Sequence, residues 1–289
     1  MRQFQSITFI NAIVGVLVLM CSCFGVAEEM RNRVIISDDA KLQSLNKTEL
    51  FTLYSEITKQ EYYLHINAPG IASGAKHYPV VFLLDGGLTF PMLTAYHHTL
   101  ALLEELPAMI IVGIGYGTDN WQEGNSRSRD FTAPSGEREH WGGAKEFLSI
   151  LDSEILPFVA SRYAVDSQHQ LLFGHSLGGQ FGLYAASHRP DLFDAIIVNN
   201  PAIHTNTQYF IERLPALKPT SDLMLFVGIA ENDTNHFIEA RQQWLDALAT
   251  LSAAPWQMQT QQFQKHSHMS SIPVTFRSGL LWYFAQRQP

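Results

Sequence analysis

Short runs of apolar residues recur along the chain, separated by longer segments in which apolar side chains return every three or four positions. The runs have strand length and are apolar throughout, as is typical of strands buried on both faces of a parallel sheet. The longer segments have the spacing of amphipathic helices. The predicted strands are 79–84, 108–114, 171–173, 193–198 and 222–230, and the predicted helices are 92–106, 145–163, 181–187, 237–251 and 273–286.

The N-terminal part of the chain has a different pattern. Residues 51–56 and 61–67 alternate apolar and polar side chains, which predicts two half-exposed strands joined as an antiparallel hairpin at a sheet edge. Strands and helices alternate after this hairpin. The expected fold class is therefore α/β, a doubly wound and mostly parallel sheet, in one domain over residues 28–289.

The sequence Gly174-His175-Ser176-Leu177-Gly178 lies between a predicted buried strand and a predicted helix. It fits G-x-S-x-G, the nucleophile elbow of α/β-hydrolases, in which a sharp turn holds the serine at the top of the sheet. We expect Gly174 and Gly178 to be needed because a Cβ at either position would collide with the neighbouring strand or helix. A glycine-rich turn with an idle serine is the alternative interpretation.

Two strand ends offer backbone N–H donors for an oxyanion. Asp85-Gly86-Gly87 follows the strand at 79–84, and glycine lets the backbone approach a substrate. In α/β-hydrolases one donor comes from the loop after the third strand and the other from the residue after the nucleophile. We therefore expect the oxyanion hole at Gly87 and Leu177, with Asp85 orienting its loop. A plain strand-end turn at 85–87 is the alternative.

Candidate acids and bases follow Ser176 in the order that α/β-hydrolases use, which is serine, acid and histidine. Glu231 and Asp233 follow one predicted strand, and His266 and His268 follow a later, alternating strand. A serine hydroxyl becomes a good nucleophile when an imidazole accepts its proton and a carboxylate orients that imidazole. The order therefore predicts a catalytic triad.

Three further polar side chains are candidates for substrate binding. Arg129 lies in a long polar loop at 119–141, and such loops at strand ends usually carry function. Asn200 and His204 follow the strand at 193–198, at the carboxyl end where α/β folds bind ligands. An Arg-Asp pair that only pins this loop, formed from Arg127 or Arg129 and Asp130, explains the loop residues equally well.

The first 27 residues have the pattern of a secretory signal peptide. Arg2 precedes an apolar stretch at 7–20, which is short for a membrane span, and Gly25-Val26-Ala27 precedes the expected cleavage site. We expect a secreted or periplasmic protein. A lipoprotein with lipid on Cys23 and an uncleaved anchor are the alternatives. Both cysteines of the chain lie in this segment, so the exported protein is expected to contain no disulfide.

The chain is acidic, with 19 Lys and Arg against 27 Asp and Glu and a formal net charge of −8 at pH 7. This charge argues against a nucleic-acid partner and against an anionic membrane surface. The motifs imply no metal and no organic cofactor. The expected partner is a small-molecule ester.

Motifs at 78–86, 127–131, 147–157 and 174–179 and in the tail together resemble the putative-esterase branch of the α/β-hydrolases. That branch includes siderophore esterases, feruloyl esterase domains and mycolyl transferases. In its tail a small polar stretch, a proline and a Gly-Leu pair follow the catalytic histidine. Pro273 and Gly279-Leu280 match this tail, and the resemblance therefore implies His268 rather than His266.

The resemblance leaves the acid open. Glu231 ends a G-x-x-E turn like one version in the family, whereas Asn232-Asp233 resembles the acid turn of feruloyl esterases; we favour Glu231. Relatives often carry Ser-Pro-Ser where this chain has Asn200-Pro201-Ala202, so that wall of the pocket is expected to differ.

The activity that the resemblance implies is that of a secreted serine esterase acting on a siderophore-type lactone or an acyl conjugate. An acyltransferase with the same triad is one alternative. A noncatalytic binding protein on a hydrolase scaffold is another, but the full set of serine, acid and histidine argues against it.

Overall fold

The computed structural model describes residues 32–33, 42–69, 77–117, 126–135, 140–219 and 222–287. Within these residues it contains one sheet of nine strands in the order β1-β2-β3-β5-β4-β6-β7-β8-β9. The predicted signal peptide, including Cys23, lies outside the described residues. None of the described helices is long and apolar enough to cross a membrane.

The N-terminal strands form the antiparallel edge of the sheet. β2 (Thr48–Ser55) and β3 (Gln60–Asn67) pair along their whole length, and β1 (Asn32–Arg33) adds to β2. β3 also pairs antiparallel with β5 (Ile110–Gly115), which joins this hairpin to the rest of the sheet. The predicted edge hairpin is confirmed.

The remaining strands are parallel to one another and make up the centre of the sheet and its other edge. β4 lies between β5 and β6, and each later strand pairs with the one before it. Their bounds are β4 Tyr78–Leu84, β6 Val165–His175, β7 Ala195–Asn199, β8 Met224–Asn232 and β9 Gln257–Ser267. The predicted α/β class, a mostly parallel sheet with an antiparallel N-terminal hairpin, is confirmed.

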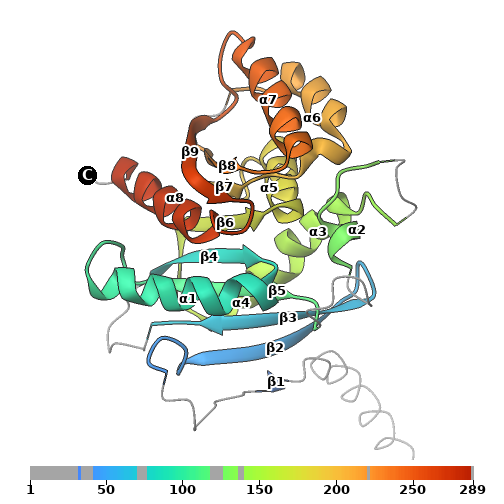
Figure 1. Ribbon diagram of the computed structural model, residues 1–289. Helices are drawn as coiled ribbons and strands as arrows, with labels where there is room; N and C mark the ends of the chain where they lie inside the picture. Colours follow the sequence, from blue (N-terminus) through green and yellow to red (C-terminus); the bar gives the residue numbers. More distant parts are fainter. Residues whose placement is uncertain are drawn as a thin grey trace, which may run out of the picture.

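Helices cover both faces of the sheet (Figure 1). On one face, buried side chains of α1 and α8 belong to the same hydrophobic core as Val81 and Leu83 of β4. On the other face, buried side chains of α3, α4, α5 and α7 belong to the same hydrophobic core as Phe82 and Leu84 of β4. The helix bounds are α1 Gly86–Leu102, α2 Arg127–Asp130, α3 Ala144–Ile150, α4 Leu156–Arg162, α5 Leu177–His188, α6 Thr207–Arg213, α7 Asn235–Ala249 and α8 Ile272–Gln286.

Two helices differ from the pattern that predicted them. α1 begins at Gly86 rather than at 92, because Pro91 lies inside the helix instead of before it. Pro91 is the sixth residue of the helix and has no N–H to donate to the carbonyl of Gly87, so α1 continues through it with one backbone hydrogen bond fewer. The predicted helix at 145–163 is α3 and α4 joined by a π-helical turn, η1 (Leu151–Ile155).

The last two strands extend further than the apolar pattern predicts. β8 continues to Asn232 and β9 to Ser267, and these two residues pair with each other after an irregularity between Ala230 and Asn232. The next residue of each strand, Asp233 and His268, therefore lie side by side just beyond the ends of β8 and β9.

Candidate active site

Ser176 occupies the sharp turn between β6 and α5, with φ 57° and ψ −117°. A Cβ on Gly174 would lie 2.1 Å from the carbonyl oxygen of Gly178, so the expected collision at Gly174 is confirmed. A Cβ on Gly178 would lie 3.3 Å from the Cβ of Leu84, which is a tight contact rather than a collision. Only the first glycine of the motif is therefore required on steric grounds.

Backbone hydrogen bonds on both sides hold this strained turn in place. The Ser176 N–H donates to Asn199 O at 3.0 Å, and the Ser176 carbonyl accepts from the N–H groups of Gln180 and Ala202, both at 2.9 Å. The turn is thus tied to its own helix and to the end of β7. Such restraint is what allows an unfavourable backbone conformation to persist at a functional site.

The two expected oxyanion donors lie at the ends of neighbouring parallel strands. Leu177 is the first residue of α5 and Gly87 the second residue of α1, and the first N–H groups of a helix have no acceptor within it. The positive ends of both helix dipoles therefore lie at the carboxyl ends of the parallel strands, where Ser176 also lies. This arrangement suits stabilisation of a negatively charged oxygen.

Asp85 joins the start of α1 to the segment that follows β5. Its backbone has φ 57°, and its carbonyl accepts from the N–H groups of Leu88 and Thr89, both at 2.9 Å. Its carboxylate makes a two-pronged ion pair with Arg127, from Nε to Oδ1 and from Nη2 to Oδ2 at 2.9 Å. These contacts agree with the expectation that Asp85 orients its loop.

His268 contacts Asp233, not Glu231. Its Nδ1 lies 3.1 Å from Oδ1 and 3.1 Å from Oδ2 of the Asp233 carboxylate, which is 0% exposed. The carboxylate of Glu231, which the sequence pattern favoured, accepts instead from the backbone N–H of Lys265 at 2.7 Å. Among the described contacts, His266 bonds to neither carboxylate; its Nδ1 lies 3.0 Å from the carbonyl oxygen of Ser270.

Strand register explains which residues meet. Asn232 and Ser267 pair at the ends of β8 and β9, so the next residue of each strand, Asp233 and His268, lie together. Glu231 precedes this pair and contacts the backbone near it instead. A pattern of apolar and polar residues does not reveal this register, because β9 is largely polar and half-exposed.

The environment of Asp233 favours its ionised form. Burial opposes ionisation, but hydrogen bonds from His268, the Thr234 N–H and Arg241 outweigh it and lower the pKa of Asp233 to about 2. An ionised carboxylate only accepts hydrogen bonds, so Nδ1 of His268 must carry the proton. The lone pair of the neutral imidazole is then on Nε2, the nitrogen that a triad needs for accepting the serine proton.

The imidazole of His268 lies between two other rings. Phe237 stacks on it with ring centroids 4.8 Å apart, and His175 lies at 4.6 Å. Asn199 donates from Nδ2 to Nδ1 of His175 at 2.9 Å, and burial lowers the pKa of His175 to about 3. A neutral His175 thus fixes the position of His268 without adding charge.

Two of the expected substrate-binding side chains are engaged inside the protein. Arg129 donates from Nε to Asp130 at 2.8 Å and from Nη2 to Gln60 at 3.3 Å. Asn200 donates to the carbonyl of His268 at 3.0 Å and to Ser271 Oγ at 2.7 Å. These contacts favour structural roles for both residues, and for Arg129 they match the loop-pinning alternative.

The third expected substrate residue, His204, lies close to His268. It belongs to the short turn η2 (Ile203–Thr205), and its ring centroid is 4.3 Å from that of Phe237, which stacks on His268. The ring of His236 lies 4.7 Å from it. Burial, together with the neighbouring His236, lowers the pKa of His204 to about 4. His204 is thus a neutral, aromatic neighbour of the Phe237 ring that stacks on His268.

Arg241 is a part of the site that the sequence interpretation missed. It lies on α7 and donates from Nη1 to Oδ2 of Asp233 at 2.8 Å. The signal was present, because Arg241 falls in line with Phe237, Trp244 and Leu248 at helical spacing. A charged residue in such an apolar stripe requires a buried partner.

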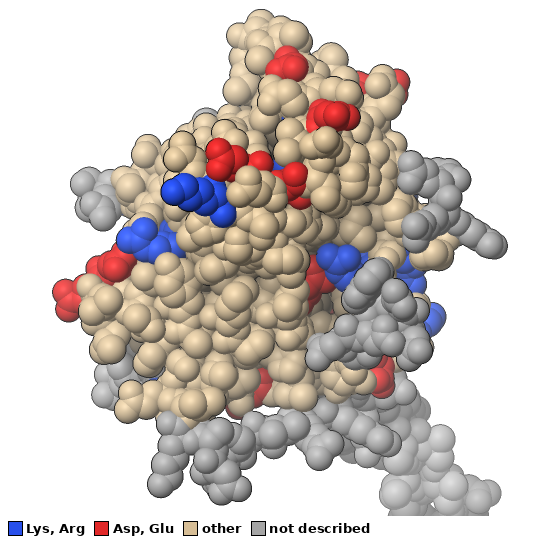
Figure 2. Space-filling model, viewed as in Figure 1, with Lys and Arg blue, Asp and Glu red and all other residues tan. Residues whose placement is uncertain are grey.

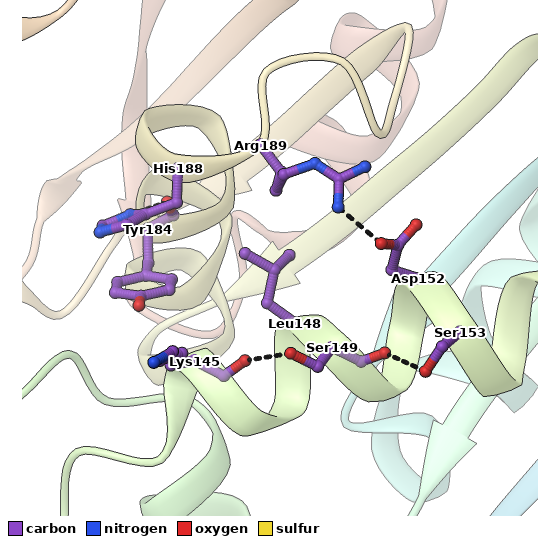
Figure 3. A pocket seen from close by; sticks show the side chains of 8 residues that line it. All are labelled: Lys145, Leu148, Ser149, Asp152, Ser153, Tyr184, His188 and Arg189. Atoms are coloured by element: carbon purple, nitrogen blue, oxygen red, sulfur yellow. Dashed lines mark hydrogen bonds and ion pairs between the residues drawn. The ribbon is translucent and has the colours of Figure 1, made fainter.

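A separate hollow of about 350 Å³ lies at the far end of α5 (Figure 3). Tyr184 and His188, from the last two turns of α5, line it opposite residues of α3 and η1. At 1.5 Å per residue, His188 is about 16 Å along the helix from Leu177. This hollow is therefore not part of the site around Ser176.

Charged side chains of both signs are scattered over the face shown in Figure 2, and several basic ones lie next to acidic ones. Among the described residues, no three His, Cys, Asp or Glu side chains are grouped so as to hold a metal ion.

Comparison with known proteins identifies the family. The profile of the putative esterase family matches residues 55–279. The chain is 28% identical over 256 residues to the ferri-bacillibactin esterase of Bacillus subtilis, which covers 81% of this chain and 88% of that one. It is 25% identical over 233 residues to an apo-salmochelin esterase of Escherichia coli, covering 74% and 71% of the two chains.

Solved structures share the fold. The BES protein from Bacillus cereus superposes with a TM-score of 0.71 at 24% identity, over 82% of this chain and 94% of that one. An IroE-like serine hydrolase from Shewanella oneidensis superposes with a TM-score of 0.72 at 23% identity, over 84% and 81%. Given the family match over most of its length, the chain belongs to the putative esterase family and is a carboxylic ester hydrolase with an α/β-hydrolase fold.

Proposed function

We propose that this protein is an exported serine esterase that hydrolyses carboxylic esters through an acyl-enzyme on Ser176. One observation carries the proposal: His268 is hydrogen-bonded to both oxygens of Asp233 and packs against His175, the residue before Ser176. Siderophore-type lactones or acyl conjugates are the proposed substrates, since the named relatives are esterases of bacillibactin and salmochelin.

In the first step, Ser176 Oγ attacks the ester carbonyl carbon while its proton passes to Nε2 of His268. The carbonyl oxygen becomes an oxyanion, which the N–H groups of Gly87 and Leu177 stabilise. The intermediate then collapses. The C–O bond to the leaving alcohol breaks, the alcohol oxygen takes the proton from Nε2, and the acyl group remains on Ser176.

In the second step, Nε2 of His268 accepts a proton from water, and the resulting hydroxide attacks the acyl carbon. Collapse of this second intermediate releases the carboxylic acid and returns the proton to Ser176 Oγ. Throughout, Asp233 remains ionised and stabilises the imidazolium that forms in each step. Asp233 rather than Glu231 is the proposed acid, because it contacts His268.

The proposed substrate pocket has His204 and Phe237 in one wall, beside His268. His204 is the one of the three expected substrate residues that we retain. Arg129 and Asn200 are assigned supporting roles, because both are hydrogen-bonded to other parts of the protein.

A fluorophosphonate probe, which reacts with activated serines, tests this function. We expect covalent labelling of the wild-type protein and none of Ser176→Ala, with hydrolysis of short acyl esters reduced by several orders of magnitude. The matched control is Ser187→Ala, on the same helix, whose hydroxyl donates to Leu183 O. Labelling of Ser176→Ala at the wild-type level would contradict the mechanism. Comparing short acyl esters, feruloyl esters and catecholate trilactones then identifies the preferred ester.

Export is the second part of the proposal and rests on the apolar segment before Gly25-Val26-Ala27. We expect cleavage after Ala27. N-terminal sequencing of the exported protein checks this expectation. A chain that begins at Cys23 would instead indicate a lipoprotein, and one that begins at Met1 would indicate an uncleaved anchor.

A further inference from the structure

A buried arginine lies behind the proposed catalytic acid. Arg241, whose side chain is 2% exposed, donates from Nη1 to Oδ2 of Asp233 at 2.8 Å. His268 contacts the same carboxylate from the other side. The Nε and Nη2 atoms of Arg241 are also buried and have no hydrogen-bond partner among the described residues.

The burial of this arginine carries an energetic cost that its one contact only partly offsets. Taking a guanidinium out of water costs several kcal/mol, and two of its N–H groups gain no partner in return. Burial lowers the pKa of Arg241, although arginine stays protonated in proteins. A structural role in α7 could be filled by an apolar side chain at lower cost. What Arg241 alone supplies is a permanent positive charge in contact with the acid.

The other titratable groups around His268 do not supply such a charge. His175 on β6 and His204 on η2 are held neutral because burial lowers the pKa of each, to about 3 and about 4. Glu231 and His266 are hydrogen-bonded to backbone atoms. The remaining groups near His268 are His236 on α7, Lys265 on β9 and, beyond His175, Arg127 paired with Asp85. Neither of the two cations, Lys265 and Arg127, is among the described donors to the Asp233 carboxylate, which are His268, the Thr234 N–H and Arg241.

We infer that Arg241 is a positioning residue that sets the pH range over which the proposed esterase is active, by sharing the carboxylate of Asp233 with His268. This inference rests on the proposed triad of Ser176, His268 and Asp233. A carboxylate beside an imidazole stabilises the imidazolium and raises its pKa, and a cation on the same carboxylate opposes that effect. With Arg241 present, the acid limit of esterase activity is therefore expected at a lower pH than without this charge.

The test is the pH dependence of kcat/KM for a short-chain p-nitrophenyl ester, with the purified full chain. Arg241→Gln retains a donor for Asp233 and removes the charge, whereas Arg241→Lys retains the charge. The acid limb is the range of low pH in which kcat/KM falls. We expect this limb to move up by about one pH unit in Arg241→Gln, because a neighbouring charge shifts a pKa by 1–3 units. At pH values below the limb, kcat/KM should therefore be roughly tenfold lower than in wild type. Arg241→Lys should stay within about 0.3 unit of wild type, since its charge is unchanged.

A control and a second variant keep the result interpretable. Arg189→Met removes an arginine that pairs with Asp152 and Asp191 at the far end of α5, and it should leave the acid limb where it is. If Arg241→Gln does not fold, Arg241→Met makes the same comparison with an apolar side chain of similar length.

The outcomes separate the inference from the proposed function. If Ser176→Ala is inactive and the limb of Arg241→Gln coincides with that of wild type, the role of Arg241 is wrong and the triad stands. A uniform fall in rate at every pH would likewise indicate a purely structural arginine. An equal shift in Arg241→Lys would also overturn the inference. If Ser176→Ala keeps wild-type activity, the proposed function fails and the inference fails with it.

Discussion

The side-chain amide of Asn200 donates a hydrogen bond of 3.0 Å to the backbone carbonyl of His268. The same amide nitrogen donates to Ser271 Oγ at 2.7 Å, and Oδ1 accepts from the N–H of Ala230 at 2.7 Å. One buried side chain thus ties together the end of β7, the end of β8 and the loop that carries the proposed base. Its φ of 45° lies in the region that asparagine tolerates better than most residues.

Asn200→Gly removes this amide without straining the backbone, because glycine adopts a positive φ freely. We expect a loss of about 1–3 kcal/mol in the free energy of unfolding, since the Ala230 N–H is left buried without a partner. We also expect kcat to fall about tenfold as the His268 loop loosens. Urea unfolding and steady-state kinetics measure both. Asn206→Gly, at a half-buried asparagine whose amide donates to the carbonyl of Pro134, is the control. A destabilised variant with unchanged kcat would show that Asn200 supports the fold alone.

The strained backbone at Ser176 is expected to lower the free energy of unfolding, although the proposed activity requires a serine there. At φ 57° and ψ −117° a side chain is strained, whereas glycine is not. Ser176→Gly and Ser176→Ala both lack the nucleophile, so they differ mainly in this strain. We expect Ser176→Gly to be more stable than Ser176→Ala by about 1 kcal/mol, measured by thermal or urea unfolding. Equal stabilities would mean that the elbow stores no strain.

Paired substitutions assign the acid and the base. Because His268 contacts Asp233, we expect Asp233→Asn to lose far more activity than Glu231→Gln, and His268→Ala far more than His266→Ala. His268→Ala should fall about as far as Ser176→Ala, since the members of such a unit fail together. Asp233→Asn should fall less far than His268→Ala. Activity that depends on Glu231 and His266 instead would mean that the strand register at Asn232 and Ser267 is wrong.

Buried histidine predicts how stability depends on pH. The folded-state pKa of His175 is lowered by burial to about 3 from an ordinary value of 6.5, so between these values the unfolded chain binds more protons. The free energy of unfolding should therefore fall as the pH drops from 6.5 towards 3, by up to about 1.4 kcal/mol per pH unit for this group. Asp233 affects stability at lower pH. Its contribution to the free energy of unfolding is complete above pH 3.8 and is lost as the pH falls towards about 2.

Urea unfolding at several pH values between 7 and 4 measures this slope. His175→Gln keeps an acceptor for Asn199 and removes the titrating group, so its slope should be shallower than that of wild type. His98→Gln, on α1, is the control substitution. An unchanged slope in His175→Gln would mean that other groups cause the acid sensitivity.

The ion pair between Asp85 and Arg127 predicts an energetic coupling at the oxyanion hole. Asp85→Asn keeps a residue that tolerates the positive φ but removes the charge. We expect kcat to fall by about tenfold, because Gly87 at the start of α1 loses its fixed position. Arg127→Gln should fall similarly, and the double variant should be little worse than either, as measured by a double-mutant cycle. Additive losses would show that the two residues act independently.

Much of the fold was readable from the sequence because buried parallel strands are apolar throughout. The strand at 79–84 and the hairpin at 51–67 were predicted close to their observed bounds. The start of α1 was not, because the observed helix begins at Gly86 and includes Pro91, before the predicted start at 92. The π turn within 145–163 was also missed, since a single wider turn leaves the apolar stripe nearly unchanged.

The site was harder to predict than the fold. Ser176 stays a prediction that rests on the fixed glycine of the elbow, and His268 one that rests on its spacing to Pro273 and Gly279. The carboxylate that contacts His268 could not be predicted, since Glu231 and Asp233 are two residues apart and point the same way in an extended strand. Arg129 and Asn200 were expected at the substrate, but both are held by long-range hydrogen bonds that no local pattern reveals.

Because Asn232 pairs with Ser267, the contact between Asp233 and His268 depends on the number of residues in β8 and β9 and not on which side chains those strands carry. Main-chain bonds bring Asp233 and His268 together, so the side chains along β8 and β9 are free to diverge. An insertion or deletion of one residue within either strand would not be tolerated, because it would present a different residue to the imidazole. The turn between α7 and β9, in contrast, has room to change in length. Homologous enzymes should therefore vary in length at 250–256 and keep a constant number of residues from the start of β9 to the histidine.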